Sequence, residues 1–176
     1  MPFLAAATLW LMVALASFAA AQRPASLVSA QRRPIHDWAP IRAESLRHFR
    51  ALVQIDTSNP PGNEIKAVEY LQKVLTAEGI PSKTLALDPN RPNLVARLKG
   101  TGARRPLLLL AHTDVVGVQR DKWPVDPFGA VLRDGYIWGR GTTDDKDNLT
   151  ANLMAFLLAK RAGTRLERDL IFLAES

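Results

Sequence analysis

A histidine and an aspartate stand two residues apart at the end of an apolar run. The run is PLLLLA at 106–111, and His112 and Asp114 follow it. In extended chain, residues two apart leave the backbone on the same face. A metal-binding imidazole usually gives its second N–H to a carboxylate, which fixes the tautomer and raises ligand basicity. The pair therefore predicts a metal-ligating histidine with its orienting acid. Taken alone, it also fits a surface histidine beside an acid.

Two further carboxylates follow a glycine-rich segment downstream. The segment Gly139-Arg-Gly-Thr-Thr-Asp-Asp-Lys146 places Asp144 beside Asp145, just before a helix predicted to start near residues 147–148. Adjacent carboxylates repel, and a nearby cation relieves that repulsion. Imidazole and carboxylate together suit Zn²⁺ or a related divalent ion. The segment lacks the Gly-Lys-Ser/Thr order of a phosphate loop and the spaced ligands of an EF-hand loop. Its alternative, taken alone, is a capped helix with solvated acids.

The elements that must position these residues alternate between helices and apolar strands. Helical period covers 43–55, 64–79 and 148–162; strands are predicted at 83–87, 93–98, 106–111 and 170–174, with a hairpin over 131–138. The continuous apolar run at 106–111 predicts a strand buried on both faces. Functional groups of open α/β sheets collect at the carboxyl ends of strands. The pattern therefore predicts an α/β layered domain with a parallel or mixed sheet.

Composition excludes several classes of protein. The chain has 176 residues, 23 Lys and Arg against 17 Asp and Glu, a net charge of +6, and no cysteine. The lack of cysteine excludes a disulfide framework, a Cys-ligated zinc finger and a thiol nucleophile. The basic excess is dispersed rather than gathered into a stripe with interleaved aromatics, so we expect no nucleic-acid partner.

Residues 3–21 form an uncharged, nearly all-apolar segment. It ends in three alanines before Gln22, which fits a small-residue cleavage site, although no Lys or Arg precedes it. The segment is also long enough to cross a bilayer once as an uncleaved anchor, and a misread start is a third alternative. We expect residues 1–21 to be a signal peptide or N-terminal anchor and 22–40 a linker. The protein is then exported (periplasmic or secreted), or membrane-anchored facing outward.

In their order along the chain, these motifs resemble the co-catalytic zinc hydrolases of metallopeptidase family M20, which includes aminoacylases, glutamate carboxypeptidases and succinyl-diaminopimelate desuccinylases. The shared motifs are Asn59-Pro-Pro-Gly-Asn-Glu64, the strand with His-x-Asp, Trp123…Pro127-Phe128, Asp134-Gly135, Gly139-Arg-Gly-x-x-Asp-Asp-Lys146 and a strand ending Leu-Ala-Glu175. The resemblance covers residues 41–176. It implies the N-terminal part of a three-layer, zinc-peptidase-like catalytic domain with a mixed, mostly parallel sheet, truncated in this chain.

The resemblance implies a role for each matching residue. His112 matches the first metal ligand, and Asp114 matches the catalytic-site acid that orients it. Asp144 matches the carboxylate that bridges two metals, and the peptide bond to Asp145 is commonly cis in relatives. Asp147 stands where many relatives have glycine, which departs from the family pattern in the loop while leaving the ligand pattern intact.

The implied activity is metal-dependent hydrolysis of amide or peptide bonds through a metal-activated water, by a carboxypeptidase or an N-acyl amino acid amidohydrolase. The implied cofactor is two Zn²⁺ per site, with Co²⁺ or Mn²⁺ as alternatives; the implied substrate is a small peptide or N-acyl amino acid, and the implied partner a second copy through a missing domain. The family's Glu-Glu pair, a general base and a ligand, is expected just beyond Glu175, so this fragment alone is expected to be inactive. The alternatives are a non-catalytic metal-binding or scaffold protein that kept the fold, and a membrane-anchored interaction domain.

Overall fold

The computed structural model describes residues 37–176, and this part of the chain contains three α-helices. They are α1 (Ala39–Val53), α2 (Ile65–Ala77) and α3 (Lys146–Ala162). The predicted leader lies outside the described residues, as does most of the predicted linker. Helix α1 begins inside the end of that linker, because Pro40 is well tolerated in a first helical turn where no N–H is needed. None of the described helices combines the length and the apolar character that crossing a membrane requires.

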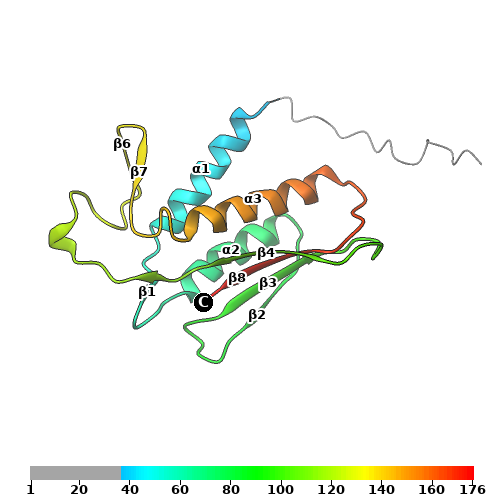
Figure 1. The fold of residues 1–176 in the computed structure, drawn as a ribbon, viewed down its shortest axis with the longest axis horizontal. Helices are drawn as coiled ribbons and strands as arrows, with labels where there is room; N and C mark the ends of the chain where they lie inside the picture. Colours follow the sequence, from blue (N-terminus) through cyan, green and yellow to red (C-terminus); the bar gives the residue numbers. More distant parts are fainter. Residues whose placement is uncertain (1–36) are drawn as a thin grey trace, which may run out of the picture. The chain divides into compact units, whose positions relative to one another are not determined.

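A four-stranded mixed sheet carries the strand that ends at His112. The strands are β2 (Ser82–Leu85), β3 (Asn93–Leu98), β4 (Leu107–His112) and β8 (Leu170–Glu175), in the order β2-β3-β8-β4. Strand β8 is antiparallel to β3 and parallel to β4, so the last strand lies between two earlier ones (Figure 1). The register pairs His112 with Glu175, at the carboxyl ends of both parallel strands. The predicted mixed α/β architecture is confirmed.

Smaller elements surround the carboxyl end of β4. A two-stranded parallel sheet joins β1 (Ser58–Asn59) to β5 (Val115–Val116), directly after the His-x-Asp segment. A short 3₁₀ turn, η2 (Arg120–Lys122), precedes the predicted hairpin, which is present as β6 (Val131–Arg133) and β7 (Tyr136–Trp138). Its turn residues Asp134 and Gly135 have φ of 54° and 80°, which two-residue hairpin turns require.

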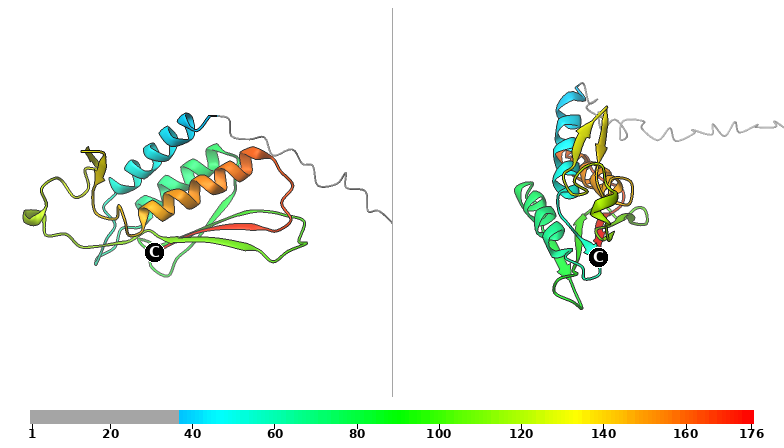
Figure 2. Two further views of the ribbon diagram at one scale, coloured as in Figure 1. Left: turned by 45° about the horizontal axis from the view of Figure 1, so that its top comes forward. Right: turned by 90° about the vertical axis from the view of Figure 1, so that its left-hand side faces the viewer.

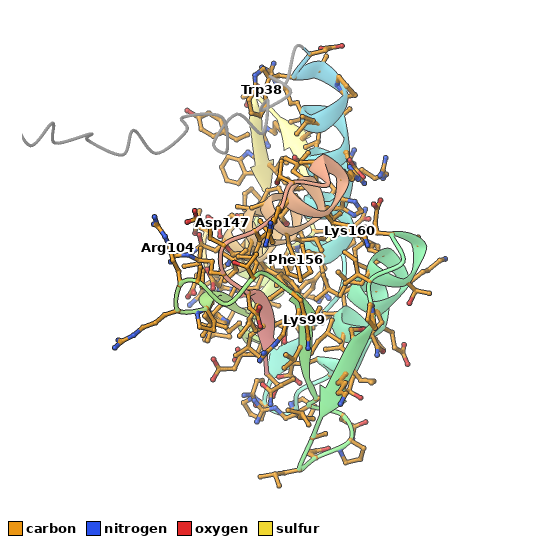
Figure 3. The ribbon with its side chains drawn as sticks, turned by 90° about the vertical axis from the view of Figure 1, so that its right-hand side faces the viewer. Trp38, Lys99, Arg104, Asp147, Phe156 and Lys160 are labelled. Carbon is orange, nitrogen blue, oxygen red and sulfur yellow. The ribbon has the colours of Figure 1, made fainter. Side chains whose placement is uncertain are left out.

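The helices lie together on one side of the sheet, as Figure 2 shows. Helix α2 contacts β2 and β3, helix α3 contacts β4 and β8, and α1 packs against α3. Phe156 of α3 meets Phe172 of β8 with ring centroids 5.7 Å apart, and both side chains are fully buried. Figure 3 shows Phe156 among the packed side chains and Arg104 on an outer loop. Burial of this apolar layer fixes where α3, and therefore the loop before it, can lie.

The prediction that β4 is buried on both faces is wrong for the described residues. Ala111 is fully buried and Leu109 packs against the core, but Leu108 and Leu110 are 49% and 47% exposed. Strand β4 is an edge strand of the sheet that residues 37–176 form, and the helices of this segment cover only one of its faces. In residues 37–176, one face of β4 is therefore buried, and the apolar side chains of its other face are exposed.

Candidate active site

The two residues predicted to share a metal lie in direct contact. Nε2 of His112 is 2.8 Å from Oδ1 of Asp144, and the other ring nitrogen, Nδ1, is 3.0 Å from Oδ1 of Asp114. Nδ1 also lies 3.1 Å from the Asp114 carbonyl oxygen. An Nδ1–H that donates to Asp114 leaves the lone pair on Nε2, the nitrogen that faces Asp144. The structure therefore brings all three predicted site residues together around one imidazole.

Two buried threonines hold the His-x-Asp segment in place. Thr113 donates its backbone N–H and its hydroxyl to the Glu175 carbonyl, at 2.7 and 2.8 Å. The Thr57 hydroxyl donates to the Thr113 carbonyl at 2.7 Å, and the Val115 N–H donates to the Thr57 carbonyl at 3.0 Å. Both threonine side chains are fully buried. Because the backbone that directly follows His112 is hydrogen-bonded to two other segments, the point from which the imidazole projects is fixed.

The loop that carries Asp144 is closely packed against its surroundings. A Cβ at Gly139 would lie 2.5 Å from Val53, and one at Gly141, where φ is +84°, would lie 2.8 Å from Val115. The peptide bond between Asp144 and Asp145 is cis, as the family resemblance implied. Helix α3 starts at Lys146, one to two residues earlier than predicted, with Asp145 at its N-cap position.

Two further contacts fasten this loop. The Asp145 carboxylate accepts the His112 backbone N–H at 3.2 Å, which ties the loop to the end of β4. Lys146 is fully buried and its ammonium donates to the Ile55 carbonyl at 2.6 Å. Burial lowers the pKa of Lys146 to about 8, against the opposing attraction of Asp56 and Asp114. The sequence pattern around Asp144 and Asp145 does not reveal that Lys146 is buried and joins this loop to Ile55.

Carboxylates dominate the electrostatics around the imidazole. Partial burial lowers the pKa of the His112 imidazole, but the hydrogen bond to Asp144 and the charge of Asp114 outweigh it, so the pKa is raised above its ordinary value. Negative charge at the site therefore favours a cation on or beside the ring. A bound divalent ion would take the place of that proton at Nε2.

The donor set fits part of a divalent metal site. An imidazole nitrogen and a carboxylate oxygen converge, and the Asp144 side chain is 80% exposed, which leaves it open to a further ligand. Within residues 37–176, no cluster of three or more His, Cys, Asp and Glu side chains could hold a metal unaided. Imidazole with carboxylate is a typical Zn²⁺ donor set, in which structural and catalytic sites use three or four protein ligands. The described residues therefore fit one side of a metal centre.

Residues 108–176, which include all three site residues, match the sequence model of Peptidase family M20/M25/M40. The chain belongs to this peptidase family. Its similarity to a probable succinyl-diaminopimelate desuccinylase of Staphylococcus epidermidis is 35% identity over 133 residues, 74% of this chain and 32% of that protein. Its similarity to an N-formyl-4-amino-5-aminomethyl-2-methylpyrimidine deformylase of Halalkalibacterium halodurans is 36% over 135 residues, with the same two shares.

A solved structure gives the same picture of the fold. The M20 family metallo-carboxypeptidase Sso-CP2 of Sulfolobus solfataricus superimposes with a TM-score of 0.64 at 23% identity, over 75% of this chain and 30% of that one. This peptidase-family chain spans about a third of the length of the curated relatives that it matches.

A pocket that the sequence pattern did not indicate adjoins Asp144. The side chains of Trp123, Trp138 and Arg140 line one cavity together with Asp144. The missed signal was spacing: Trp123 precedes the hairpin and Arg140 follows it, so the hairpin returns the chain to the same place. A sequence pattern alone does not reveal that return, because it depends on the hairpin and on the Arg140 N–H that donates to the Pro127 carbonyl at 2.7 Å.

Proposed function

We propose that the protein is a metal-dependent hydrolase of amide bonds and that residues 37–176 supply one side of its metal centre. The observation that carries the proposal is the convergence of His112 Nε2 and Asp144 Oδ1 at 2.8 Å, with Nδ1 held by Asp114. Membership of the peptidase family supports the reaction class. The names of the two relatives, a desuccinylase and a deformylase, both describe removal of an acyl group.

In this proposal each of the three residues has a separate task. His112 would hold a cation through Nε2, Asp114 keeps the opposite nitrogen protonated and the ring oriented, and Asp144 would contribute its carboxylate to the same metal centre. Bound divalent cations polarise an amide carbonyl and lower the pKa of water. We propose Zn²⁺, two per site, with Co²⁺ or Mn²⁺ as alternatives, because imidazole and carboxylate donors suit these ions. Proton transfer to the leaving amine is assigned to the glutamate pair that follows this strand in the family.

The test is hydrolysis of N-acyl amino acids and dipeptides by the full-length protein. We expect Zn²⁺-dependent activity, and we expect His112→Ala and Asp144→Ala to lose more than the roughly 10–100-fold typical of changes outside the ligand shell. Bound metal, measured by elemental analysis, falls in both variants. The control is Asp134→Asn in the exposed hairpin turn. Equal rates in the wild type and Asp144→Ala overturn the proposal.

The alternative is a non-catalytic metal-binding protein with the same fold. The observation that supports it is the small donor set within residues 37–176, which contains no group of three or more candidate ligands and is expected to hold metal weakly on its own. A full-length protein that binds two Zn²⁺ per chain but cleaves none of these amides establishes the alternative. The isolated segment is expected to be inactive in either case.

We also propose that residues 3–21 direct export. The support is the uncharged apolar run followed by three alanines before Gln22. N-terminal sequencing of the protein recovered outside the cytoplasm tests this: a mature chain that starts at Gln22 indicates cleavage, whereas Met1 on a membrane-bound product indicates an anchor.

A further inference from the structure

A pocket opens beside Asp144, on the side where the hairpin lies. It has a volume of about 380 Å³. Three aromatic side chains form part of its wall, and the loop that carries Asp144 forms the rest; the aromatic residues are Trp123, Tyr136 and Trp138. This volume is at the lower end of the range of small-molecule sites. Because Asp144 is part of the wall, a group bound here lies next to the proposed metal centre.

Arg140 is the cation in the lining of this pocket, which also includes the Asp144 carboxylate. Its guanidinium carbon is 5.4 Å from the centroid of the Trp123 ring, a cation–π distance. Its Nε is buried and has no hydrogen-bond partner within residues 37–176. Stacking satisfies the face of a guanidinium but none of its five N–H donors, which lie in the plane of the guanidinium group. A cation held in this way favours an anion with two coplanar acceptor oxygens, and a carboxylate has that geometry.

We propose that this pocket binds a carboxylate group of the substrate, with Arg140 as its ion-pair partner and Trp123 as the platform that holds the guanidinium. The inference rests on the proposed amide hydrolysis and adds a specificity residue to it. The carboxylate belongs to a small substituent a few atoms from the scissile bond, because the pocket is small and adjoins Asp144. It lies either on the acyl group or on the leaving amine, and the choice of substrates separates the two.

The experiment uses the full-length, metal-loaded protein and three amides. N-succinyl-L-alanine carries a carboxylate on both sides of the amide, N-butyryl-L-alanine only on the amine side, and N-succinyl-L-alaninamide only on the acyl side. The variants are Arg140→Met, which keeps the stem without the charge, and Arg140→Lys, which keeps the charge without the fork. The control is Arg133→Met; Arg133 is an exposed arginine of the hairpin that precedes Arg140, and it pairs with Asp134 outside the pocket.

We expect Arg140→Met to raise KM about 10–100-fold for substrates that carry the recognised carboxylate, with little change in kcat, as the loss of one charged hydrogen-bonding partner predicts. Arg140→Lys recovers part of the loss, and Arg133→Met behaves as the wild type. If the acyl carboxylate is the one bound, N-butyryl-L-alanine is unaffected; if the amine-side carboxylate is bound, N-succinyl-L-alaninamide is unaffected. An equal loss on all three substrates, or no loss on any, overturns the inference.

A binding measurement keeps the pocket testable apart from catalysis. N-succinyl-L-alanine is titrated into the metal-free full-length protein by calorimetry, with Asp144→Asn as a second variant. We expect binding to weaken in Arg140→Met and to persist in Asp144→Asn. Binding that is unchanged in Arg140→Met overturns the inference, even when the wild type hydrolyses amides. Failure of the wild type to cleave any of the three amides counts against the proposed function instead.

Discussion

Nε2 of His112 lies 2.8 Å from Oδ1 of Asp144, although 32 residues separate them in the chain. The first sits at the end of β4 and the second on the loop before α3, and α3 packs against β4. The core between helix and sheet thus sets the distance between the two donors. Changes to that packing, or to the loop, should therefore act on metal binding.

Asp114→Asn tests the orienting acid. The amide keeps the shape of the side chain but removes the negative charge that Nδ1 faces at 3.0 Å. We expect Zn²⁺ affinity of the full-length protein to fall about 10–100-fold, as for other carboxylates that orient a metal-bound histidine. Competition with a chromogenic chelator measures the affinity. An unchanged affinity would show that the Asp114 carbonyl alone orients the ring.

Gly141→Ala tests the packing of the metal loop. A methyl group there meets Val115 at 2.8 Å in addition to an unfavourable φ of +84°. Gly135→Ala is the matched control, because its φ is +80° but nothing lies within 4 Å of the added carbon. We expect the control to cost about 1 kcal/mol in unfolding free energy and Gly141→Ala to cost more and to weaken Zn²⁺ binding. Equal urea midpoints for the two variants would contradict this reading.

Lys146→Met tests the buried hydrogen bond from Lys146 to Ile55. The change removes the donor to the Ile55 carbonyl and leaves that acceptor unpaired. We expect a loss of about 1–3 kcal/mol in unfolding free energy, the usual penalty for an unsatisfied buried polar group. Lys160→Met on the exposed face of the same helix is the control, with an expected change within about 0.5 kcal/mol. Urea denaturation at pH 7 compares the two variants. Similar losses of unfolding free energy would contradict a stabilising role for the Lys146 hydrogen bond.

The decrease in unfolding free energy at acid pH should depend on Glu44. The hydrogen bond from Arg161 holds the pKa of Glu44 at about 2, below its ordinary value of 4.5, although partial burial opposes this shift. Since the folded-state pKa is lowered, the stabilisation is complete above pH 4.5 and is lost as the pH falls toward 2. We expect Glu44→Gln to lower the unfolding free energy at pH 7 and to flatten its fall between those pH values.

The control for this prediction is Glu167→Gln. Glu167 pairs with Arg104 on the surface, where the two side chains are 64% and 61% exposed. Exposed pairs contribute little, so the control should keep the wild-type pH dependence. Urea midpoints between pH 2.5 and 7 give the comparison. If the urea midpoint of Glu44→Gln falls with decreasing pH as steeply as that of the wild type, Glu44 is not the cause of the acid destabilisation.

The sequence was sufficient for the parts of this molecule that depend on local pattern. Helical period, the Asp134–Gly135 turn and the paired motifs at His112 and Asp144 indicated elements that the structure contains. The exposed face of β4 could not be predicted, because PLLLLA is equally apolar whether one face or both are covered. The Arg140 pocket and the Lys146 contact were missed because both join segments far apart in the chain, through a hairpin and a helix end that one-dimensional spacing does not encode.

Strand β8 lies between β3 and β4, so the sheet cannot form strand by strand in the order of synthesis. As the chain leaves the ribosome, β4 emerges with its leucines, and its partner among the strands of residues 37–176 is β8, which follows only at residues 170–175. The backbone around His112, at the end of β4, is therefore fixed only once β8 has paired with it. Parallel pairing between distant segments forms slowly, so the end of β4 that carries His112 is ordered only after α3 and β8 have been made, and nascent chains are vulnerable to aggregation through β4 until then.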